Sequence, residues 1–325
     1  MIGYYVHHHG QGHLHRALAL AERIDEPVTG LSSLPRPAAW PGGWLELPRD
    51  DGGPDPVDVT AGGRLHWVPL GDAGLRARSA ALARWLDEAA PRLVVADVSV
   101  EVATLVRLHG VPVVSVVLPG RRTDPAHLLG FGLSTALVTF SPLPARALLP
   151  GVPDEVVRRV VSLGALSRFP PGDGPRPDGP PRVVVLQGRG GPVTRRTATD
   201  LAALAPGWEW TVLGGEGGWV EDVGALLRAA DVVVTHAGEG ALADTAAHRR
   251  PAVVVPAERP FAEQETTAAQ LQDPAWPAIV LPRLPDRGWP ALLERAASLD
   301  GRAWSRWYDG RAAERFADVV SGVAA

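Results

Sequence analysis

The sequence contains neither cysteine nor lysine, and each absence excludes a class of chemistry. Without a cysteine among its 325 residues, the chain has no disulfide framework, no thiolate zinc site and no cysteine nucleophile or redox centre. All 32 residues in the combined lysine and arginine count are arginine, so a Schiff-base lysine and a P-loop lysine are excluded as well. Any catalysis therefore depends on other side chains.

Long hydrophobic runs are also absent. No stretch of about 18 uncharged apolar residues is present to span a bilayer, and residues 1–6 lead into histidines and glycines without the basic and apolar regions of an export signal. The formal net charge is −4 with no basic run, which gives little reason to expect a nucleic-acid partner. We expect a cytoplasmic protein with at most peripheral membrane contact.

The length and the distribution of proline predict two domains. A chain of 325 residues and 34.3 kDa exceeds the usual size of one hydrophobic core. Proline and glycine dominate residues 168–181, where the apolar pattern stops, so this segment is expected to be a linker. We expect an N-terminal domain at 1–167 and a C-terminal domain at 182–302. An amphipathic helix from about 303 to 323, within residues 303–325, is expected to pack back across the cleft onto the N-terminal domain.

Strand and helix patterns alternate in both halves. The first half predicts strands at 2–6, 93–97 and 111–117 and helices at 16–24, 75–90 and 101–109; the second predicts strands at 182–186, 210–213, 232–235 and 252–256. Residues 30–72 are expected to form short strands, at 44–47 and 65–68, and long loops. The alternation predicts an α/β protein with parallel sheets.

One glycine-bearing turn stands between a predicted buried strand and a predicted helix, at residues 236–240. Free N–H groups and the dipole at such a helix start favour an anion such as a diphosphate, and Gly238 and Gly240 let the backbone approach it closely. His236 would supply a hydrogen bond or a positive charge at a leaving group. Asp244, one turn into the helix, is placed to accept from ribose hydroxyls. A purely structural turn is the alternative.

The segment from His236 through Pro251 and Pro256 to Glu263 and Gln264 resembles the nucleotide-sugar signature of GT-B glycosyltransferases. The similar families are the UDP-glycosyltransferases and the peptidoglycan lipid II N-acetylglucosaminyltransferase, of the family 28 C-terminal type. This resemblance implies two Rossmann-like domains whose parallel sheets face each other across a cleft. It also implies sugar transfer without a metal or other cofactor.

Individual residues carry the resemblance. His236 and Asp244 have the family's spacing of eight positions, which implies contacts with diphosphate and ribose, and Glu239 lies in the turn between them. Glu263 and Gln264 stand where the family has an acidic-glutamine pair that binds the donor sugar.

The chain departs from the family pattern at three points. An aspartate replaces the usual ribose-binding glutamate, and Gly240 and Ala241 replace small polar residues of the phosphate turn. A Trp-Gln base-stacking signature is not evident, which leaves the identity of the base open.

The first loop, residues 10–16, has the form G-x-G-H-x-x-R. It resembles the first loop of the GT-B superfamily and that of the UDP-sugar hydrolase of pseudaminic acid biosynthesis, which places Gly12 near the donor. His13 is the candidate general base, because imidazole titrates near neutral pH. Asp97, at the end of a predicted strand, would orient it; the alternative is that Asp97 caps the next helix.

Two arginine-containing segments are weaker candidates. The glycine loop at 188–191 resembles the first loop of the family's donor domain, which places Gly190 and Gly191 near the phosphates. Arg121 and Arg122 are candidates for an anionic acceptor or a donor phosphate, although exposed arginine pairs are usually solvated.

Three consecutive histidines, residues 7–9, raise the question of a metal. If they continue the first strand, only His7 and His9 share a face. With no cysteine and no acidic-x-acidic motif, we expect no catalytic metal here and assign these side chains to the cleft lining or to phosphate contact.

These observations predict an inverting, metal-independent hexosyltransferase that uses a nucleotide diphosphate sugar, first of all a UDP-sugar. A nucleotide-sugar hydrolase, an epimerase and a catalytically degenerate nucleotide-sugar-binding protein remain alternatives. The acceptor, whether small molecule, lipid or glycan, and the oligomeric state stay open.

Overall fold

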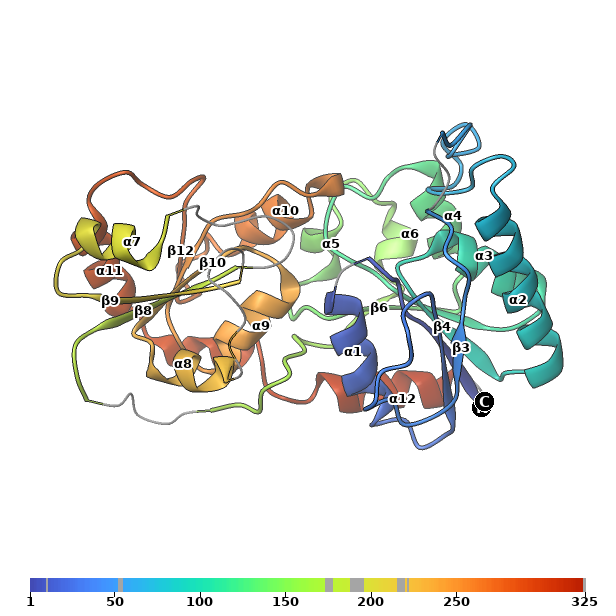
Figure 1. Ribbon diagram of the computed structural model, residues 1–325, viewed down its shortest axis with the longest axis horizontal. Coiled ribbons are helices and arrows are strands. Elements are labelled where there is room, and N and C mark those ends of the chain that lie inside the picture. The colour runs from blue at the N-terminus through green and yellow to red at the C-terminus, as the bar shows by residue number, and fades with distance from the viewer. Residues whose placement is uncertain are drawn as a thin grey trace.

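The computed structural model describes residues 1–9, 11–51, 55–172, 178–187, 196–214, 220 and 222–323. These residues form two β-sheets with helices packed around them, and the two sheets lie one after the other along the long axis of the molecule (Figure 1). All strand pairs in both sheets are parallel.

The first sheet has seven strands. They are β1 (Ile2–Tyr5), β2 (Val28–Ser32), β3 (Trp44–Glu46), β4 (Leu93–Asp97), β5 (Val113–Val116), β6 (Ala136–Thr139) and β7 (Val160–Ser162). The order across the sheet is β3-β2-β1-β4-β5-β6-β7. Its helices are α1 (Gln11–Ala21), α2 (Ala73–Ala89), α3 (Val100–Leu108), α4 (Pro125–Leu133), α5 (Ala145–Leu148) and α6 (Asp154–Val157).

The second sheet has five strands. They are β8 (Arg182–Leu186), β9 (Glu209–Leu213), β10 (Val232–Thr235), β11 (Ala252–Val254) and β12 (Ala278–Val280), in the order β12-β11-β10-β8-β9. The helices around it are α7 (Ala198–Leu204), α8 (Val223–Ala229), α9 (Glu239–Ala247), α10 (Glu263–Gln270) and α11 (Trp289–Ala297). Short 3-10 turns, η2 (Pro260–Ala262) and η3 (Gly301–Arg306), and a last helix, α12 (Ala312–Gly322), complete the described elements.

Helices cover both faces of the central strands, which explains why these strands consist almost entirely of apolar residues. Every residue of β1, β4 and β10 is buried. Strands buried on both faces have near-continuous runs of valine, isoleucine and leucine rather than an alternating pattern. The predicted α/β class with parallel sheets is therefore confirmed, as are the predicted helix at 75–90 and the strands at 93–97 and 232–235.

Two local predictions were wrong. Residues 65–68 form no strand, because Val68 donates its N–H to the carbonyl of Val59 inside the same loop. The helix predicted at 303–323 is divided into η3 and α12, since Gly310 adopts a left-handed φ of 79° between them.

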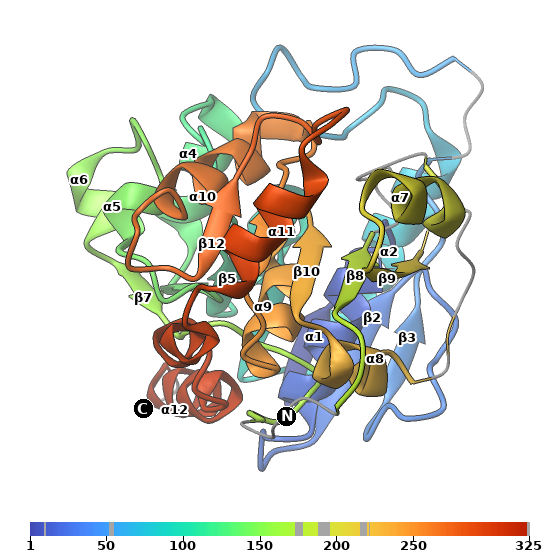
Figure 2. The ribbon, with the colours of Figure 1, turned by 90° about the vertical axis from the view of Figure 1, so that its left-hand side faces the viewer.

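The last segment of the chain crosses from the second sheet to the first. Trp304 and Trp307 pack with Trp276 beside the second sheet, whereas α12 runs next to α1 (Figures 1 and 2). Phe316 of α12 enters the core of the first sheet, with its ring 6.4 Å from that of Tyr4. The exact domain boundaries stay a prediction.

Truncating Phe316 tests this return of the chain. The side chain is 0% exposed, so Phe316→Ala should lower the free energy of unfolding by about 3–5 kcal/mol, measured by urea denaturation. Leu108→Ala, at a side chain that is 78% exposed, serves as the control and should cost less than about 1 kcal/mol. Equal, small effects of the two substitutions would show that α12 does not pack on the first sheet.

Candidate active site

The strand order of each sheet marks where a ligand is expected. The winding changes direction between β1 and β4 in the first sheet and between β8 and β10 in the second. Open α/β sheets bind ligands beyond the carboxyl ends of the strands at such points. His13 and Asp97 lie at the first point and His236 at the second, while Gly190 and Gly191 fall outside the described residues.

His13 and Asp97 are in contact. His13 stands in the first turn of α1, and its Nδ1 lies 3.1 Å from Oδ1 of Asp97, which ends β4 and is 0% exposed. An ionised carboxylate only accepts hydrogen bonds, so Nδ1 carries the proton and Nε2 is left as an acceptor. Asp97 is not the cap of α3, because Ser99 takes that role by accepting from the N–H of Val102.

Arg16, the last residue of the G-x-G-H-x-x-R motif, connects the two halves. Its Nη1 donates to Oδ1 of Asp97 at 2.8 Å, and its Nη2 donates to Oε2 of Glu239 at 2.6 Å. Since Asp97 lies in the first sheet and Glu239 begins α9, the two switch points face each other. The sequence motif contained this arginine but did not indicate its bridging role.

The two carboxylates bound by Arg16 differ in protonation. Burial alone would raise the pKa of Asp97, but Arg16 and His13 outweigh it, and the pKa lies below its ordinary value. Burial raises the pKa of Glu239 to about 7, with Glu263 and Asp97 adding to the effect and Arg16 opposing it. Asp97 is therefore ionised at neutral pH, whereas the pKa of Glu239 lies close to neutral pH.

His236 is held as a neutral hydrogen-bond donor. The N–H of Gly238 donates to its Nδ1 at 3.0 Å, and Nε2 of Gln264 lies 3.2 Å from the same atom. Burial, with the nearby charge of Arg259, lowers the pKa of His236 to about 4. The proton of the neutral ring is consequently on Nε2. Of the two roles that the sequence left open, this favours a hydrogen bond over a positive charge.

Gln264 fixes the turn that contains His236. Its Oε1 accepts from the N–H groups of Ala237, at 3.1 Å, and Ala257, at 2.9 Å, and the residue is 2% exposed. These bonds tie the loop after β10 to the loop after β11. The side chain expected to bind the donor sugar thus has its amide engaged within the protein.

The neighbouring Glu263 forms a second contact between the halves. Its Oε2 lies 3.3 Å from Nη2 of Arg122. The expectation of a solvated arginine pair was wrong for Arg122, which is buried and packs on the ring of Phe261 at 5.1 Å. The backbone N–H of Arg121 also donates to the carbonyl of Phe261, at 2.7 Å.

Asp244 lies at the connection between the halves. Its carboxylate accepts from Oγ of Ser167 at 2.7 Å and from Nε of Arg168 at 3.1 Å. Burial raises its pKa, although Arg168 and Ser167 oppose this. A ribose at this position would compete with Arg168 for the carboxylate.

The start of α9 has the properties of an anion site. Gly238 is the N-cap and supplies no side-chain hydrogen bond to the first turn. The first N–H groups of a helix lack partners within the helix, and together with the dipole they favour an anion. At Gly240, as at Gly12 in α1, no protein atom lies within 4 Å of where a Cβ would stand. A ligand can therefore come close to the backbone at these glycines.

A cavity of about 470 Å³ lies beside His13 in the first half. His7 belongs to its lining, and the ring of His7 is 5.7 Å from the ring of His13. Most of the exposed cavity surface is apolar, and the apolar lining residues are Tyr5, Leu65, Trp67, Val68, Leu75, Leu82, Val102, Leu105 and Leu108.

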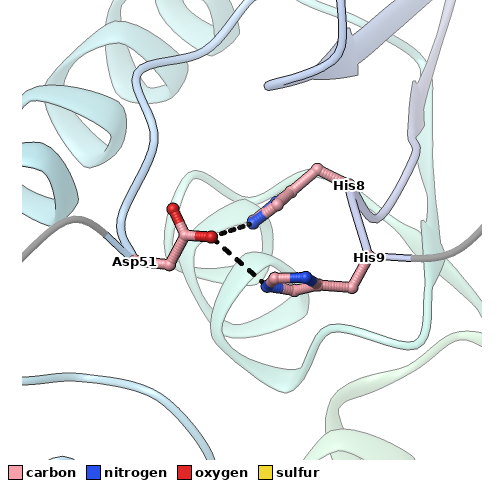
Figure 3. Close-up of side chains that lie close together, drawn as sticks. All are labelled: His8, His9 and Asp51. Carbon is pink, nitrogen blue, oxygen red and sulfur yellow. Dashed lines mark ion pairs between the residues drawn. The ribbon is translucent and has the colours of Figure 1, made fainter.

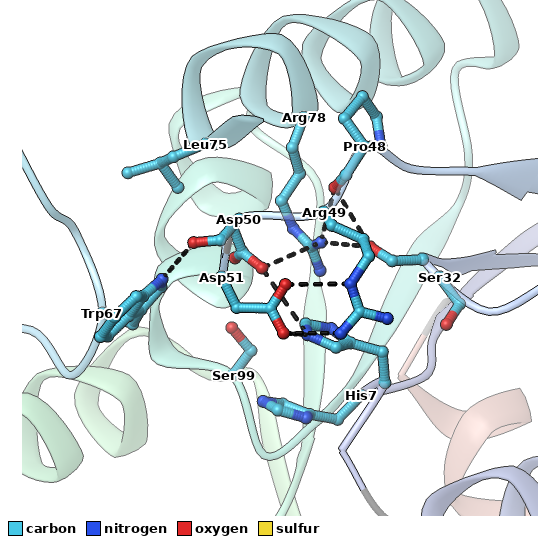
Figure 4. Close-up of polar contacts among 12 residues, drawn as sticks. His7, Ser32, Pro48, Arg49, Asp50, Asp51, Trp67, Leu75, Arg78 and Ser99 are labelled. Carbon is cyan, nitrogen blue, oxygen red and sulfur yellow. Dashed lines mark hydrogen bonds and ion pairs between the residues drawn. The ribbon is translucent and has the colours of Figure 1, made fainter. Parts of the chain in front are cut away.

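Arg78 supports one wall of this cavity. It donates to the hydroxyls of Ser33 and Tyr5, both at 2.6 Å. It also donates to the carbonyl of Pro48 at 3.1 Å (Figure 4). The expected strand-like alternation of residues 7–9 was wrong, because β1 ends at Tyr5. The rings of His7 and His8 stack at 5.3 Å instead.

A further polar cluster was missed by the sequence analysis. Nδ1 of His127 lies 2.5 Å from Asp124, and Nε2 of His66 lies 3.2 Å from the same carboxylate. Nη1 of Arg122 donates to Nε2 of His127 at 2.9 Å. His66 is 58 positions from Asp124 in the chain, so no local spacing connects them.

Known proteins resemble this chain in fold over its whole length. The glycotransferase of kitacinnamycin superposes with a TM-score of 0.68 at 19% identity, covering 99% of this chain and 98% of the other. MurG of Acinetobacter baumannii gives 0.61 at 14% identity, with 99% of both chains covered. UGT2 of Phytolacca americana, complexed with UDP-2fluoro-glucose and pterostilbene, gives 0.62 at 15% identity, with 100% and 99% covered. No curated protein sequence matches the chain.

The chain thus has the GT-B fold of these glycosyltransferases, with two parallel sheets whose switch points face each other. Residues 218–282, which include His236 and Gln264, match the glycosyltransferase family 28 C-terminal domain. Among the described parts of the chain, no helix is long and apolar enough to span a membrane.

The raised pKa of Glu239 predicts a pH-dependent effect of Glu239→Gln. A carboxyl whose pKa rises on folding stabilises the fold below its unfolded value of 4.5, and this contribution is lost as the pH rises through about 7. Relative to the wild type, the variant should therefore gain about 1–3 kcal/mol of unfolding free energy between pH 5 and pH 8. Urea denaturation at both pH values measures this change.

Glu265→Gln is the matched control, since Glu265 is exposed on α10. The effect of this control on stability at the two pH values gives the baseline for comparison. If Glu239→Gln behaves like this control, Glu239 does not titrate near neutral pH.

Proposed function

We propose that this chain transfers a hexosyl group from a nucleotide diphosphate sugar to a hydroxyl of an apolar acceptor. The observation that carries the proposal is the His13–Asp97 pair, joined through Arg16 to Glu239 at the start of α9. A general base in one half thereby faces an anion-binding helix start in the other.

The second half supplies the groups for the departing nucleotide. The uncapped N–H groups at the start of α9 and the Nε2–H of His236 are hydrogen-bond donors for a diphosphate. A negatively charged Glu239 would repel that anion. The positive charge of Arg16 compensates the carboxylate, and the raised pKa of Glu239, about 7, lowers its average negative charge. These donors stabilise the leaving group, and the proposed transfer needs no metal at the diphosphate.

The first half supplies the base and the acceptor site. Nε2 of His13 takes the proton from the acceptor hydroxyl, whose oxygen attacks the anomeric carbon as the bond to the diphosphate breaks. Asp97 holds the ring orientation and stabilises the imidazolium that forms. A single displacement inverts the anomeric configuration.

Two observations support the choice of substrates. The largely apolar surface of the cavity beside His13 favours an apolar acceptor that carries a hydroxyl. The similar structure of UGT2 contains UDP-2fluoro-glucose and pterostilbene, which supports a UDP-sugar as the first donor to test.

Donor binding is tested at two glycines. A Cβ at Gly238 would stand 2.5 Å from Cε1 of His236, so Gly238→Ala should displace this ring and weaken UDP binding at least tenfold. A Cβ at Gly240 meets no protein atom within 4 Å, so a loss of affinity in Gly240→Ala would come from the ligand itself. Thermal shifts and calorimetry with UDP-, TDP- and GDP-sugars provide the measurement.

Gly132→Ala is the control for adding a methyl group to a helix, since it too has open space around it. It should bind donors like the wild type. The absence of stabilisation by any nucleotide sugar or free nucleoside diphosphate at millimolar concentration would refute the proposed donor.

The catalytic pair is tested by His13→Ala and Asp97→Asn. Both should lower kcat by a factor of about 10²–10⁴ while leaving the Kd for the donor within a few-fold of the wild type. His109→Ala, at an exposed histidine at the end of α3, should retain full activity. Turnover that survives both substitutions would remove His13 and Asp97 from the mechanism.

The same assay separates transfer from hydrolysis. Sugar release without any acceptor, lost in His13→Ala, would identify the chain as a nucleotide-sugar hydrolase, as the G-x-G-H-x-x-R loop allows. Transfer instead requires an acceptor-dependent product.

A further inference from the structure

Three side chains converge on one wall of the cavity: His8, His9 and Asp51 (Figure 3). Nε2 of His8 lies 3.5 Å, and Nε2 of His9 3.6 Å, from the same carboxylate oxygen, Oδ2 of Asp51. Oδ1 of Asp50 is 3.8 Å from Nε2 of His8. The ligand atoms of His8, His9 and Asp51 all lie within 4.8 Å of one another. Asp50 is close to His8 but also lies 3.5 Å from Nη1 of Arg78.

His8 is buried without a hydrogen bond. Its side chain is 3% exposed, and neither ring nitrogen has a hydrogen-bond partner among the described residues. Leaving a buried polar group unpaired costs about 1–3 kcal/mol, so such a group in a native structure calls for a ligand or another partner.

The separations fit a shared ion. Zinc binds imidazole nitrogen and carboxylate oxygen at about 2.0–2.2 Å, so two such ligands at a tetrahedral angle stand roughly 3.4 Å apart. The distances of 3.5 and 3.6 Å from the two imidazoles to Asp51 are close to this value. The two His–Asp51 separations therefore match the spacing of ligands around one ion.

We propose that His8, His9 and Asp51 bind a divalent transition metal ion such as zinc or cobalt. Asp50 is the nearest further ligand. Two imidazoles with carboxylate suit these ions. All four residues line the cavity, so a remaining coordination position is available to water or to an acceptor oxygen. The site is separate from the diphosphate, where the proposed transfer uses only hydrogen-bond donors.

Arg49 competes for the same carboxylate. Its Nη2 and Nε donate to Oδ2 and Oδ1 of Asp51 at 2.6 and 3.0 Å, while its own side chain is 59% exposed (Figure 4). Exposed pairs of this kind contribute little stability, so an ion can displace the arginine. Removing it should strengthen metal binding.

The cluster of His66, Asp124 and His127 provides an internal comparison. Its ligand atoms are also close together, but Nη1 of Arg122 donates to Nε2 of His127 and places a positive charge beside it. The N–H of His127 also donates to Asp124, which caps α4. We therefore assign no ion to this cluster and use it as the control.

Cobalt titration of the full chain, purified without a polyhistidine tag and treated with EDTA, tests the site. Visible absorption and calorimetry should show one equivalent bound with a Kd in the micromolar range or tighter. Asp51→Asn and His8→Gln should weaken binding at least tenfold, Arg49→Ala should tighten it, and His66→Gln should leave it unchanged.

Two results would overturn the proposal. One is the absence of saturable binding by the wild type at millimolar cobalt. The other is binding that persists in Asp51→Asn but is lost in His66→Gln, which would place the ion at the second cluster. Asp51 is partly exposed, so Asp51→Asn remains informative if His8→Gln fails to fold. Thermal melting without metal shows whether each variant is folded. Neither result depends on transferase activity.

Discussion

The guanidinium of Arg16, held between Asp97 and Glu239, is the interaction on which the site depends. It joins the ends of two sheets that belong to different halves of the chain. It also balances the negative charge of two carboxylates in a largely buried region. Removing one partner of such a buried set leaves an uncompensated charge, which costs about 3–5 kcal/mol. The same contact keeps Asp97 ionised, and only an ionised Asp97 fixes the proton of His13 on Nδ1.

The two histidines of the site have opposite hydrogen-bonding polarity. Asp97 accepts from Nδ1 of His13 and leaves Nε2 as a base, whereas the N–H of Gly238 donates to Nδ1 of His236 and leaves Nε2–H as a donor. One ring is therefore prepared to take a proton and the other to hold an anion. Neighbouring groups, rather than the residue type, determine which of the two tasks a histidine performs.

Parts of this arrangement follow from the sequence. The pairing of His13 with Asp97 is predictable from the sequence. His13 follows one buried strand, Asp97 ends another, and the carboxyl ends of parallel strands lie at the same edge of a sheet. The partners of Arg16 and Glu263 could not, since they depend on how one half sits against the other. The contact between His8 and Asp51 likewise requires the loop after β3 to return to the end of β1, and no local pattern encodes this. The motif gives the position of Gln264 but not the hydrogen bonds that its side chain accepts from Ala237 and Ala257.

The chain passes between the two halves twice, once before β8 and once between η3 and α12, and the two passages are bonded to each other. The hydroxyl of Tyr308 on the second passage donates to the carbonyl of Phe169 on the first, at 2.6 Å. Two adjacent, bonded connections restrict the relative motion of the halves more than a single linker would. Asp244, which accepts from Ser167 beside the first passage, and Glu239, which accepts from Arg16, both belong to α9. One short helix therefore contacts both the connection and the first sheet. Any separation of the two halves has to break the ion pair between Arg16 and Glu239.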